Sequence, residues 1–287
     1  MDILQLDHRK VLEFFPPRTN DSHKGNYGKD LLLCGSRGFT GAATLAAMGA
    51  LRVGAGLVYL AVPESIYAIE AIKLTEPIVY PLPDENGKYA EAAIPAIREL
   101  MQGKNTILIG PGMGQSVGTA AVTCMVLKEF QGTVILDADG INVIRDHIDV
   151  LRERTSPTIL TPHDGEFVRI GGKITEDRIE SATALANDLG VIVLLKGHRT
   201  IITDGVTCYV NTTGNPGMAT GGSGDVLSGM IAGLVGQGIA PIQAAACSAW
   251  LHGAAGDICS DQLGQYSMLP SDMLDVLPRL LKQDGIY

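Results

Sequence analysis

Short apolar runs alternate along the chain with longer, Ala-rich stretches. Four runs are continuously apolar, namely Leu31–Leu33, Ile107–Ile109, Val134–Leu136 and Ile192–Leu195. A strand buried on both faces has this pattern, because neither of its faces alternates with solvent. The pattern predicts strands at Asp30–Cys34, Leu57–Val62, Thr106–Ile109, Thr133–Leu136, Thr158–Thr161 and Val191–Leu195. It predicts helices at Ala42–Val53, Val117–Phe130, Ile179–Leu189 and from Asp225 to about Cys259.

Two further segments need separate interpretation. Ile201–Thr203 and Cys208–Val210 flank Asp204-Gly205, which is typical of a β-hairpin. Val226–Leu251 contains no charged residue and is long enough to span a membrane. Glycines and a proline interrupt it, however, so two buried helices joined at Gly236–Pro241 explain it better.

The alternation of strand, loop and helix predicts an α/β fold with a mainly parallel central sheet and helices on both faces. We find no linker and no repeat of fixed period, so we expect one domain over residues 1–287. In such folds ligands bind at the carboxyl ends of the strands. This chain has its glycines, prolines, Asp, Asn and His residues at those positions, which is the first indication of a site.

Composition and charge exclude several classes of protein. With 46% hydrophobic and 18% charged residues, the chain is expected to be globular. A net charge of −9 argues against a broad nucleic-acid surface. The five cysteines are spread out and form no C-x-x-C pair, which disfavours a zinc cluster or a disulfide scaffold and fits a reducing cytoplasm. The charged start of the chain is unlike a signal peptide.

The richest segment for chemistry is Asn211–Gly229. Its glycines Gly221, Gly222 and Gly224 let backbone N–H groups turn toward one point, and the helix that follows adds its own free N–H groups. Together they predict an anion hole for a phosphate. Asp225 is expected at its rim, where a carboxylate can take a proton from a substrate hydroxyl. The alternative is that Asp225 only caps the helix.

Two common phosphate-binding motifs are absent. A Walker A loop requires a Ser or Thr after its lysine, whereas Gly28-Lys29 is followed by Asp30. The dinucleotide fingerprint G-x-G-x-x-G requires a third glycine, and Gln115 stands in that position after Gly110-Pro111-Gly112. An ordinary P-loop protein and an ordinary Rossmann dehydrogenase are both excluded.

Eight motifs in order carry a family resemblance over nearly the whole chain. They are Asn26–Asp30, Gly35–Ala43, Arg52–Gly56, Ile109–Gly114, Leu136–Asn142, Thr161–Glu166, Leu195–Thr200 and Gly214–Asp225. In these the sequence resembles the ADP- or ATP-dependent NAD(P)H-hydrate dehydratases of the ribokinase-like superfamily. One departure is Asp164, where the family pattern has Pro.

The resemblance implies a three-layer ribokinase-like fold and a repair reaction. The enzyme would phosphorylate the hydroxyl of NADH or NADPH hydrate and then release phosphate, which restores the reduced cofactor. The resemblance further implies ADP or ATP as phosphoryl donor, Mg²⁺ and a homotetramer. The epimerase domain often fused to such enzymes has no counterpart in this sequence, so we expect dehydratase activity alone.

The resemblance also assigns site residues. Asp225 would be the catalytic base, and Gly222, Ser223 and Gly224 would donate to the transferred phosphate. The hydrate would contact Ala43, Gly112, Gly114, Asn142, His163 and Asp225. The adenine nucleotide would contact Lys196, Gly197, His198, Arg199, Thr200 and Gly224. Glu166 would hold Mg²⁺ through water.

Several alternatives stay open at this point. His163 can be a plain loop residue, Lys196 a solvated surface lysine, and Asp137 and Asp139 helix caps. The same glycine loop and Asp225 also fit a kinase for a vitamin precursor of the hydroxymethylpyrimidine or hydroxyethylthiazole type. A nucleotide-binding sensor without catalysis is the third hypothesis.

Overall fold

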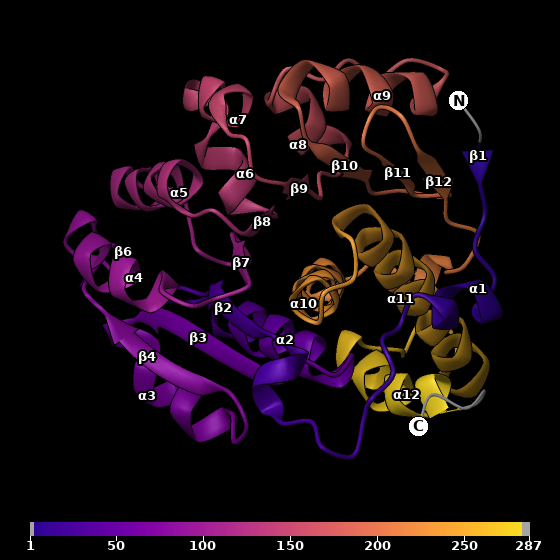
Figure 1. The fold of residues 1–287 in the computed structure, drawn as a ribbon, viewed down its shortest axis with the longest axis horizontal. Helices are drawn as coiled ribbons and strands as arrows, with labels where there is room; N and C mark the ends of the chain where they lie inside the picture. The colour runs from indigo at the N-terminus through magenta and orange to yellow at the C-terminus, as the bar shows by residue number, and fades with distance from the viewer. Residues whose placement is uncertain (1–2, 283–287) are drawn as a thin grey trace.

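The computed structural model describes residues 3–282 and has a ten-stranded sheet at its centre (Figure 1). The order of the strands across the sheet is β1-β12-β11-β10-β9-β8-β7-β2-β3-β4. Seven of the nine pairings are parallel, and the two antiparallel pairings join β10 to β11 and β11 to β12. The strands are β1 (Ile3–Leu4), β2 (Lys29–Leu33), β3 (Leu57–Pro63), β4 (Ile78–Leu82), β7 (Thr106–Ile109), β8 (Thr133–Leu136), β9 (Thr158–Leu160), β10 (Ile192–Leu195), β11 (Ile201–Thr203) and β12 (Cys208–Val210). A separate two-stranded hairpin consists of β5 (Asp84–Glu85) and β6 (Lys88–Tyr89).

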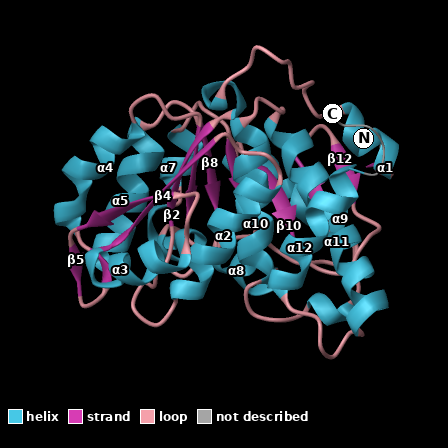
Figure 2. Ribbon diagram, turned by 90° about the horizontal axis from the view of Figure 1, so that it is seen from below, coloured by secondary structure: helices cyan, strands magenta, loops and turns pink. Residues whose placement is uncertain are grey.

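Helices cover the strands in both views (Figures 1 and 2). They are α1 (His8–Glu13), α2 (Thr40–Arg52), α3 (Glu64–Lys73), α4 (Ile94–Met101), α5 (Val117–Glu129), α6 (Asp139–Val143), α7 (Asp149–Glu153), α8 (Asp164–Arg169), α9 (Arg178–Leu189), α10 (Ser223–Gly236), α11 (Pro241–Leu263) and α12 (Pro270–Lys282). Alternate strand residues face two separate apolar cores: Leu32 and Leu108 face the core with α2, α10, α11 and α12, while Leu31 and Ile107 face the core with α4, α5 and α9. The predicted α/β architecture with two covered faces is confirmed.

The chain's own signals set several helix ends. Ser116 and Asp177 begin α5 and α9 by accepting hydrogen bonds from the N–H groups two or three residues later. Gly190 ends α9 in the left-handed conformation, with φ of 67°. The uncharged segment forms α10 and α11 with a break at residues 237–240, as predicted. Within residues 3–282, no helix combines the length and apolar character that a membrane crossing requires.

Most predicted strands begin and end within one residue of the observed ones, and the hairpin at Asp204-Gly205 is correct. Strand β4 and helix α3 were not predicted. Pro81 lies inside β4, and a proline argues against a central strand because it cannot donate to the sheet. Strand β4 is at the edge of the sheet, where such a residue is tolerated.

Helices α2 and α10 pack with their backbones unusually close. A Cβ atom on Gly229 would lie 2.0 Å from the carbonyl oxygen of Ala46, and one on Gly233 would lie 2.5 Å from that of Ala50. In the other direction, a Cβ on Gly49 would lie 2.5 Å from the carbonyl oxygen of Val226. From the 46–229 contact to the 50–233 contact both helices advance by four residues, so α2 and α10 run parallel. Since α2 follows β2 and begins at the carboxyl ends of the strands, α10 also begins there.

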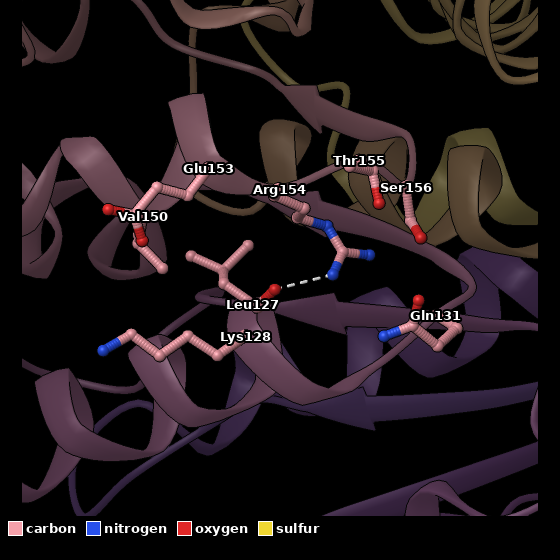
Figure 3. Close-up of a pocket in the computed structure, with 8 residues that line it drawn as sticks. All are labelled: Leu127, Lys128, Gln131, Val150, Glu153, Arg154, Thr155 and Ser156. Atoms are coloured by element: carbon pink, nitrogen blue, oxygen red, sulfur yellow. Dashed lines mark hydrogen bonds between the residues drawn. The ribbon is translucent and has the colours of Figure 1, made fainter.

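A cavity of about 170 Å³ lies at the opposite end of the sheet, before β8 and β9 begin (Figure 3). Its central residue, Arg154, donates to the carbonyl oxygens of Leu127, Phe130 and Gly132 and to Thr158 Oγ1. These carbonyls include the unpaired ones at the end of α5, which a guanidinium satisfies well. Arg154 therefore stabilises the end of α5, and its cavity is remote from the strand ends where ligands bind in this class of fold.

The close approach of α2 and α10 generates a stability prediction. Gly229→Ala should lower the free energy of unfolding by about 1–3 kcal/mol, because the added methyl overlaps the backbone of Ala46. Gly41→Ala is the matched control: nothing lies within 4 Å of its Cβ position, and helix propensity favours Ala by up to about 1 kcal/mol. Chemical denaturation of both variants measures the difference. Equal stability of the two variants would contradict the proposed tight packing.

Candidate active site at the carboxyl ends of the strands

The start of α10 forms the centre of the site. Gly222 precedes the helix in a left-handed conformation, with φ of 99°, and its carbonyl accepts the first helical hydrogen bond, from Val226 N at 3.2 Å. The N–H groups of Gly224 and Asp225 therefore come before the first residue that can bond back along the helix. They point out of the positive end of the helix dipole, which is the arrangement that binds an anion.

Ser223 fits its predicted role as a backbone donor less well. Its N–H makes a long hydrogen bond of 3.4 Å to the carbonyl of Thr220, and its hydroxyl lies 3.4 Å from Nε2 of the buried His252. Burial lowers the pKa of His252 to about 4, so this imidazole is neutral near pH 7. The donation by Gly222 and Ser223 to a phosphate stays a prediction.

Asp225 is half-buried in the first turn of α10. The residue that caps this helix is Gly222, and no side chain makes a capping hydrogen bond. The alternative that Asp225 is merely the cap is therefore wrong. Burial and, after it, the negative charge of Asp137 raise the pKa of Asp225, Lys196 lowers it, and the net result is a pKa of about 6. A carboxylate with a pKa near the working pH is suited to accept and return a proton.

Lys196 lies among carboxylates at the end of β10. Its ammonium is 2.8 Å from Asp137 Oδ1 and 3.8 Å from Glu166 Oε2, and only 23% of its side chain is exposed. Burial opposes its charged form, but Asp137 and Glu166 together raise the pKa of Lys196. The alternative of a solvated surface lysine is therefore wrong. A Cβ atom on Gly224 would lie 3.5 Å from this ammonium, so Lys196 lies directly beside the start of α10.

Asp137 is a site residue that the sequence reasoning missed. It follows β8, is 1% exposed and holds Lys196. The residue before α6 is Ala138, and no side chain caps that helix, so the capping alternative for Asp137 and Asp139 is also wrong. Ala138 has φ of 47° and ψ of −116°, a conformation that favours glycine. The available signal was the position of Asp137 directly after a fully buried strand.

The glycine loop Gly110–Gly114 packs against these residues. All three of its glycines have positive φ values of 130°, 64° and 71°. A Cβ on Gly110 would lie 1.7 Å from the carbonyl oxygen of Asp137, so glycine is required there. Asp139 accepts a hydrogen bond of 2.9 Å from Gly114 N and fixes the far end of the loop.

The burial of Ala43 and the position of Asn142 differ from what their predicted contacts with the hydrate require. Ala43 is fully buried in α2, so its methyl group presents no surface to a ligand. Asn142 was expected at a strand end, but it lies inside α6. Its side chain donates to Asp139 and accepts from Arg169, so it serves this local network. Strand β8 ends at Leu136 as predicted, but the chain then turns into a short helix directly after Ala138, so Asn142 lies past the strand end.

His163 and Glu166 begin α8 together. His163 Nδ1 accepts from the N–H groups of Gly165 and Glu166, and the Glu166 carboxylate accepts from His163 N at 3.0 Å. His163 is thus a helix cap whose ring is 58% exposed, rather than a plain loop residue. Asp164, at the position of the expected Pro, pairs with Arg178 at 2.8 Å and leaves the start of α8 intact.

The segment from Lys196 to Thr200 forms a compact turn after β10. Thr200 Oγ1 donates to the carbonyl of Gly197 at 3.0 Å, and Arg199 is held at a φ of 58°. His198 and Arg199 are exposed beside the site. The turn presents polar groups next to Lys196, as a nucleotide site requires.

Glu166 is the carboxylate at the site that could hold Mg²⁺, and it would do so only together with ligands from water and the nucleotide. Over residues 3–282, no three His, Cys, Asp or Glu side chains are arranged to hold a metal ion by themselves. Glu166 is buried, with one oxygen accepting from His163 N and lying 3.8 Å from Lys196. Mg²⁺ typically takes one or two carboxylates and completes its shell with water and substrate phosphates. Glu166 fits that mode, with the nucleotide providing the remaining ligands.

Comparison with known proteins places this geometry in context. A family model described as NAD(P)H-hydrate dehydratase matches residues 31–279. A bifunctional NAD(P)H-hydrate repair enzyme from Moorella thermoacetica is 45% identical over 93% of this chain and 52% of its own length. An ADP-dependent (S)-NAD(P)H-hydrate dehydratase from Bacillus subtilis is 35% identical over 93% of this chain and 94% of its own. The chain spans about half the length of the bifunctional relatives.

Solved structures share the fold. A ribokinase-like superfamily protein from Enterococcus faecalis matches with a TM-score of 0.86 and 28% identity, over 98% of this chain and 95% of its own. The B. subtilis ADP/ATP-dependent NAD(P)H-hydrate dehydratase, co-crystallised with ATP/Mg²⁺, matches with a TM-score of 0.82 and 32% identity over 96% of both chains. The ribokinase-like fold that the motifs implied is therefore confirmed.

The environment of Asp225 lowers the free energy of unfolding at neutral and alkaline pH. Because its pKa is raised in the folded protein, the folded state disfavours the charged form. The stability contributed by the neutral acid is present at low pH and is lost as the pH rises through about 6. Asp225→Asn should therefore raise the unfolding free energy at pH 8 by on the order of 1 kcal/mol, with the difference shrinking toward pH 4. Denaturation at both pH values tests this, and a gain that is independent of pH would contradict it.

Proposed function

The chain belongs to the NAD(P)H-hydrate dehydratase family, and from this premise we propose that it converts NADH or NADPH hydrate back to the reduced cofactor. The reaction uses ADP or ATP and proceeds by phosphorylation of the ring hydroxyl. The observation that carries the proposal is the half-buried Asp225 beside the free N–H groups at the start of α10, with Lys196 adjacent. This combination supports phosphoryl transfer to a hydroxyl.

In the first step Asp225 takes the proton of the ring hydroxyl. The hydroxyl oxygen attacks the terminal phosphorus of the nucleotide, and the bond from that phosphorus to its bridging oxygen breaks. AMP or ADP is left behind. The N–H groups of Gly222, Ser223 and Gly224 receive the negative oxygens of the phosphoryl group in transit, with Gly224 the best placed of the three.

In the second step the carbon–oxygen bond of the phosphorylated ring breaks. Phosphate leaves with the electron pair, while the lone pair of the ring nitrogen supplies electrons to the ring. The neighbouring ring carbon then loses a proton and the double bond is restored. Phosphorylation matters because hydroxide is a poor leaving group and phosphate a good one.

The two ligands occupy opposite sides of Asp225 in this proposal. The adenine nucleotide lies along Lys196, Gly197, His198, Arg199, Thr200 and Gly224, where Lys196 faces its phosphates. The hydrate lies against Gly112, Gly114, His163, Asn142 and the backbone of Ala43. Mg²⁺ at Glu166, through water, would neutralise charge on the nucleotide phosphates.

We assign the activity to one domain over residues 1–287. We further propose a cytoplasmic location and a homotetramer, since the family resemblance implies that assembly. The acidic chain, with a net charge of −9, supports a small-molecule partner rather than nucleic acid.

A repair assay tests the activity. The protein, NADH hydrate, Mg²⁺ and either ADP or ATP are mixed, and recovery of reduced-nicotinamide absorbance is followed over time. We expect recovery with at least one nucleotide and none when both are omitted. Absence of recovery with ADP and with ATP, at saturating Mg²⁺, would reject the proposed function.

A second experiment tests the role of Asp225. The carboxylate must be deprotonated to accept a proton, so kcat/KM should rise with pH and level off above about 6. Asp225→Asn should lose at least about 100-fold in turnover and keep its affinity for the nucleotide. Asp188→Asn, which changes an exposed carboxylate at the end of α9 just before β10 begins, is the control for the loss of one negative charge. Turnover retained by Asp225→Asn would remove the assigned base.

A further inference from the structure

Three loops meet on the side of the site away from Lys196, namely residues 35–39, the glycine loop and the β5–β6 hairpin. Gly35 N donates to the carbonyl of Pro111 at 2.7 Å, and Ser36 Oγ donates to that of Gly112 at 2.7 Å. Arg37 N donates to the carbonyl of Gly87, in the β5–β6 hairpin, at 2.9 Å. The loop of residues 35–39 is therefore fixed to both of its neighbours.

This fixed loop presents an aromatic ring to solvent. Phe39 is 62% exposed, although its own N–H closes a turn onto the carbonyl of Ser36 at 2.9 Å. A Cβ atom on Gly112 would lie 3.0 Å from the Cβ of Phe39, so the glycine loop runs directly behind it. An exposed aromatic ring beside a ligand site offers a face on which a nucleobase can stack.

Two cations lie on or against the same three loops, in a chain whose net charge is −9. The side chain of Lys88 lies against Gly114, and its ammonium donates to the carbonyl of Gln115 at 3.1 Å. Arg37 is exposed on the loop that also carries Phe39, and its side chain lies over Gly87. We therefore find one aromatic face and two cations around the outer end of the glycine loop.

The far end of a dinucleotide bound at the site would lie on this surface. In the proposed reaction the ring hydroxyl is at Asp225, and the donor nucleotide occupies the side of Lys196. The remainder of the dinucleotide must then leave past the glycine loop. Gly110 contacts Asp137 and Gly112 contacts Phe39, and two residues span at most about 7 Å. Phe39 is thus within the reach of a dinucleotide whose nicotinamide end is beside Asp225.

We propose that Phe39, Lys88 and Arg37 bind the adenosine half of the dinucleotide substrate, which is a distinct role from that of the donor nucleotide site. The adenine base stacks on Phe39, and the pyrophosphate faces Lys88 and Arg37. This inference rests on the proposed function for its orientation. In this proposal Phe39 contributes to the affinity for the substrate and takes no part in the chemical step, since the ring touches no reacting atom.

Truncated ligands separate this role from a structural one. Reduced nicotinamide mononucleotide lacks the adenosine half, whereas NADH contains it. Phe39→Ala should raise the Kd of NADH, measured by its fluorescence, about tenfold and leave the Kd of the mononucleotide unchanged. In turnover the same variant should raise KM for NADH hydrate, with kcat and the KM of the donor nucleotide unchanged. Phe39→Tyr should behave as the wild type.

Controls define the outcomes that overturn the proposal. Val206→Ala removes another exposed apolar side chain, at the turn on the opposite end of the sheet, and should change neither Kd. Lys88→Met should weaken NADH binding and reduce its dependence on salt. The proposal is wrong if Phe39→Ala changes both ligands equally, changes neither, or alters the oligomeric state in light scattering, which would place the ring at a contact between copies. A wild type that binds NADH through Phe39 but restores no hydrate would reject the proposed function and keep this site.

Discussion

The close packing of α2 against α10 is the constraint on which the site depends. Gly49, Gly229 and Gly233 let the two backbones approach to a distance that any side chain would prevent. Because the helices run parallel, both begin at the carboxyl ends of the strands. The start of α10 presents free N–H groups there, while the start of α2 lies against the glycine loop through Ala42. A parallel sheet accounts for the location of the site, and the three glycines account for its compactness.

Negatively charged side chains outnumber positively charged ones in this compact site. One cation, Lys196, lies beside Asp137 and within 3.8 Å of Glu166. The charges of Asp137 and Lys196 both act on the pKa of Asp225. A site with more carboxylates than cations repels a phosphate until its own charges are neutralised. The N–H groups at the start of α10 provide part of that neutralisation. In the proposed function Mg²⁺ provides the rest, which would couple binding of the nucleotide to binding of the metal.

Much of this architecture was predictable from sequence, for identifiable reasons. Buried parallel strands give continuous apolar runs, so β7 and β8 were predicted to the residue. The glycines around Asp225 predicted a phosphate site because glycine has few other uses at such density. Strand β4 was missed because an edge strand tolerates the proline that a central one excludes. Asp137 was missed as a site residue because its partner, Lys196, is 59 positions away and only the parallel sheet brings the two together. The assigned roles of the ligand-contacting residues stay predictions.

Ala138 gives the site one more property. A non-glycine residue at φ of 47° and ψ of −116° costs about 1–3 kcal/mol, and this cost is met by the packing of the Asp137–Gly140 turn against Gly110. In return, the side chain at position 138 leaves the turn fewer accessible shapes than glycine would. Asp137 and Asp139 therefore point in their separate directions before any ligand arrives. Binding at this site therefore needs no rearrangement of the Asp137–Gly140 turn, so no binding free energy is lost in ordering it.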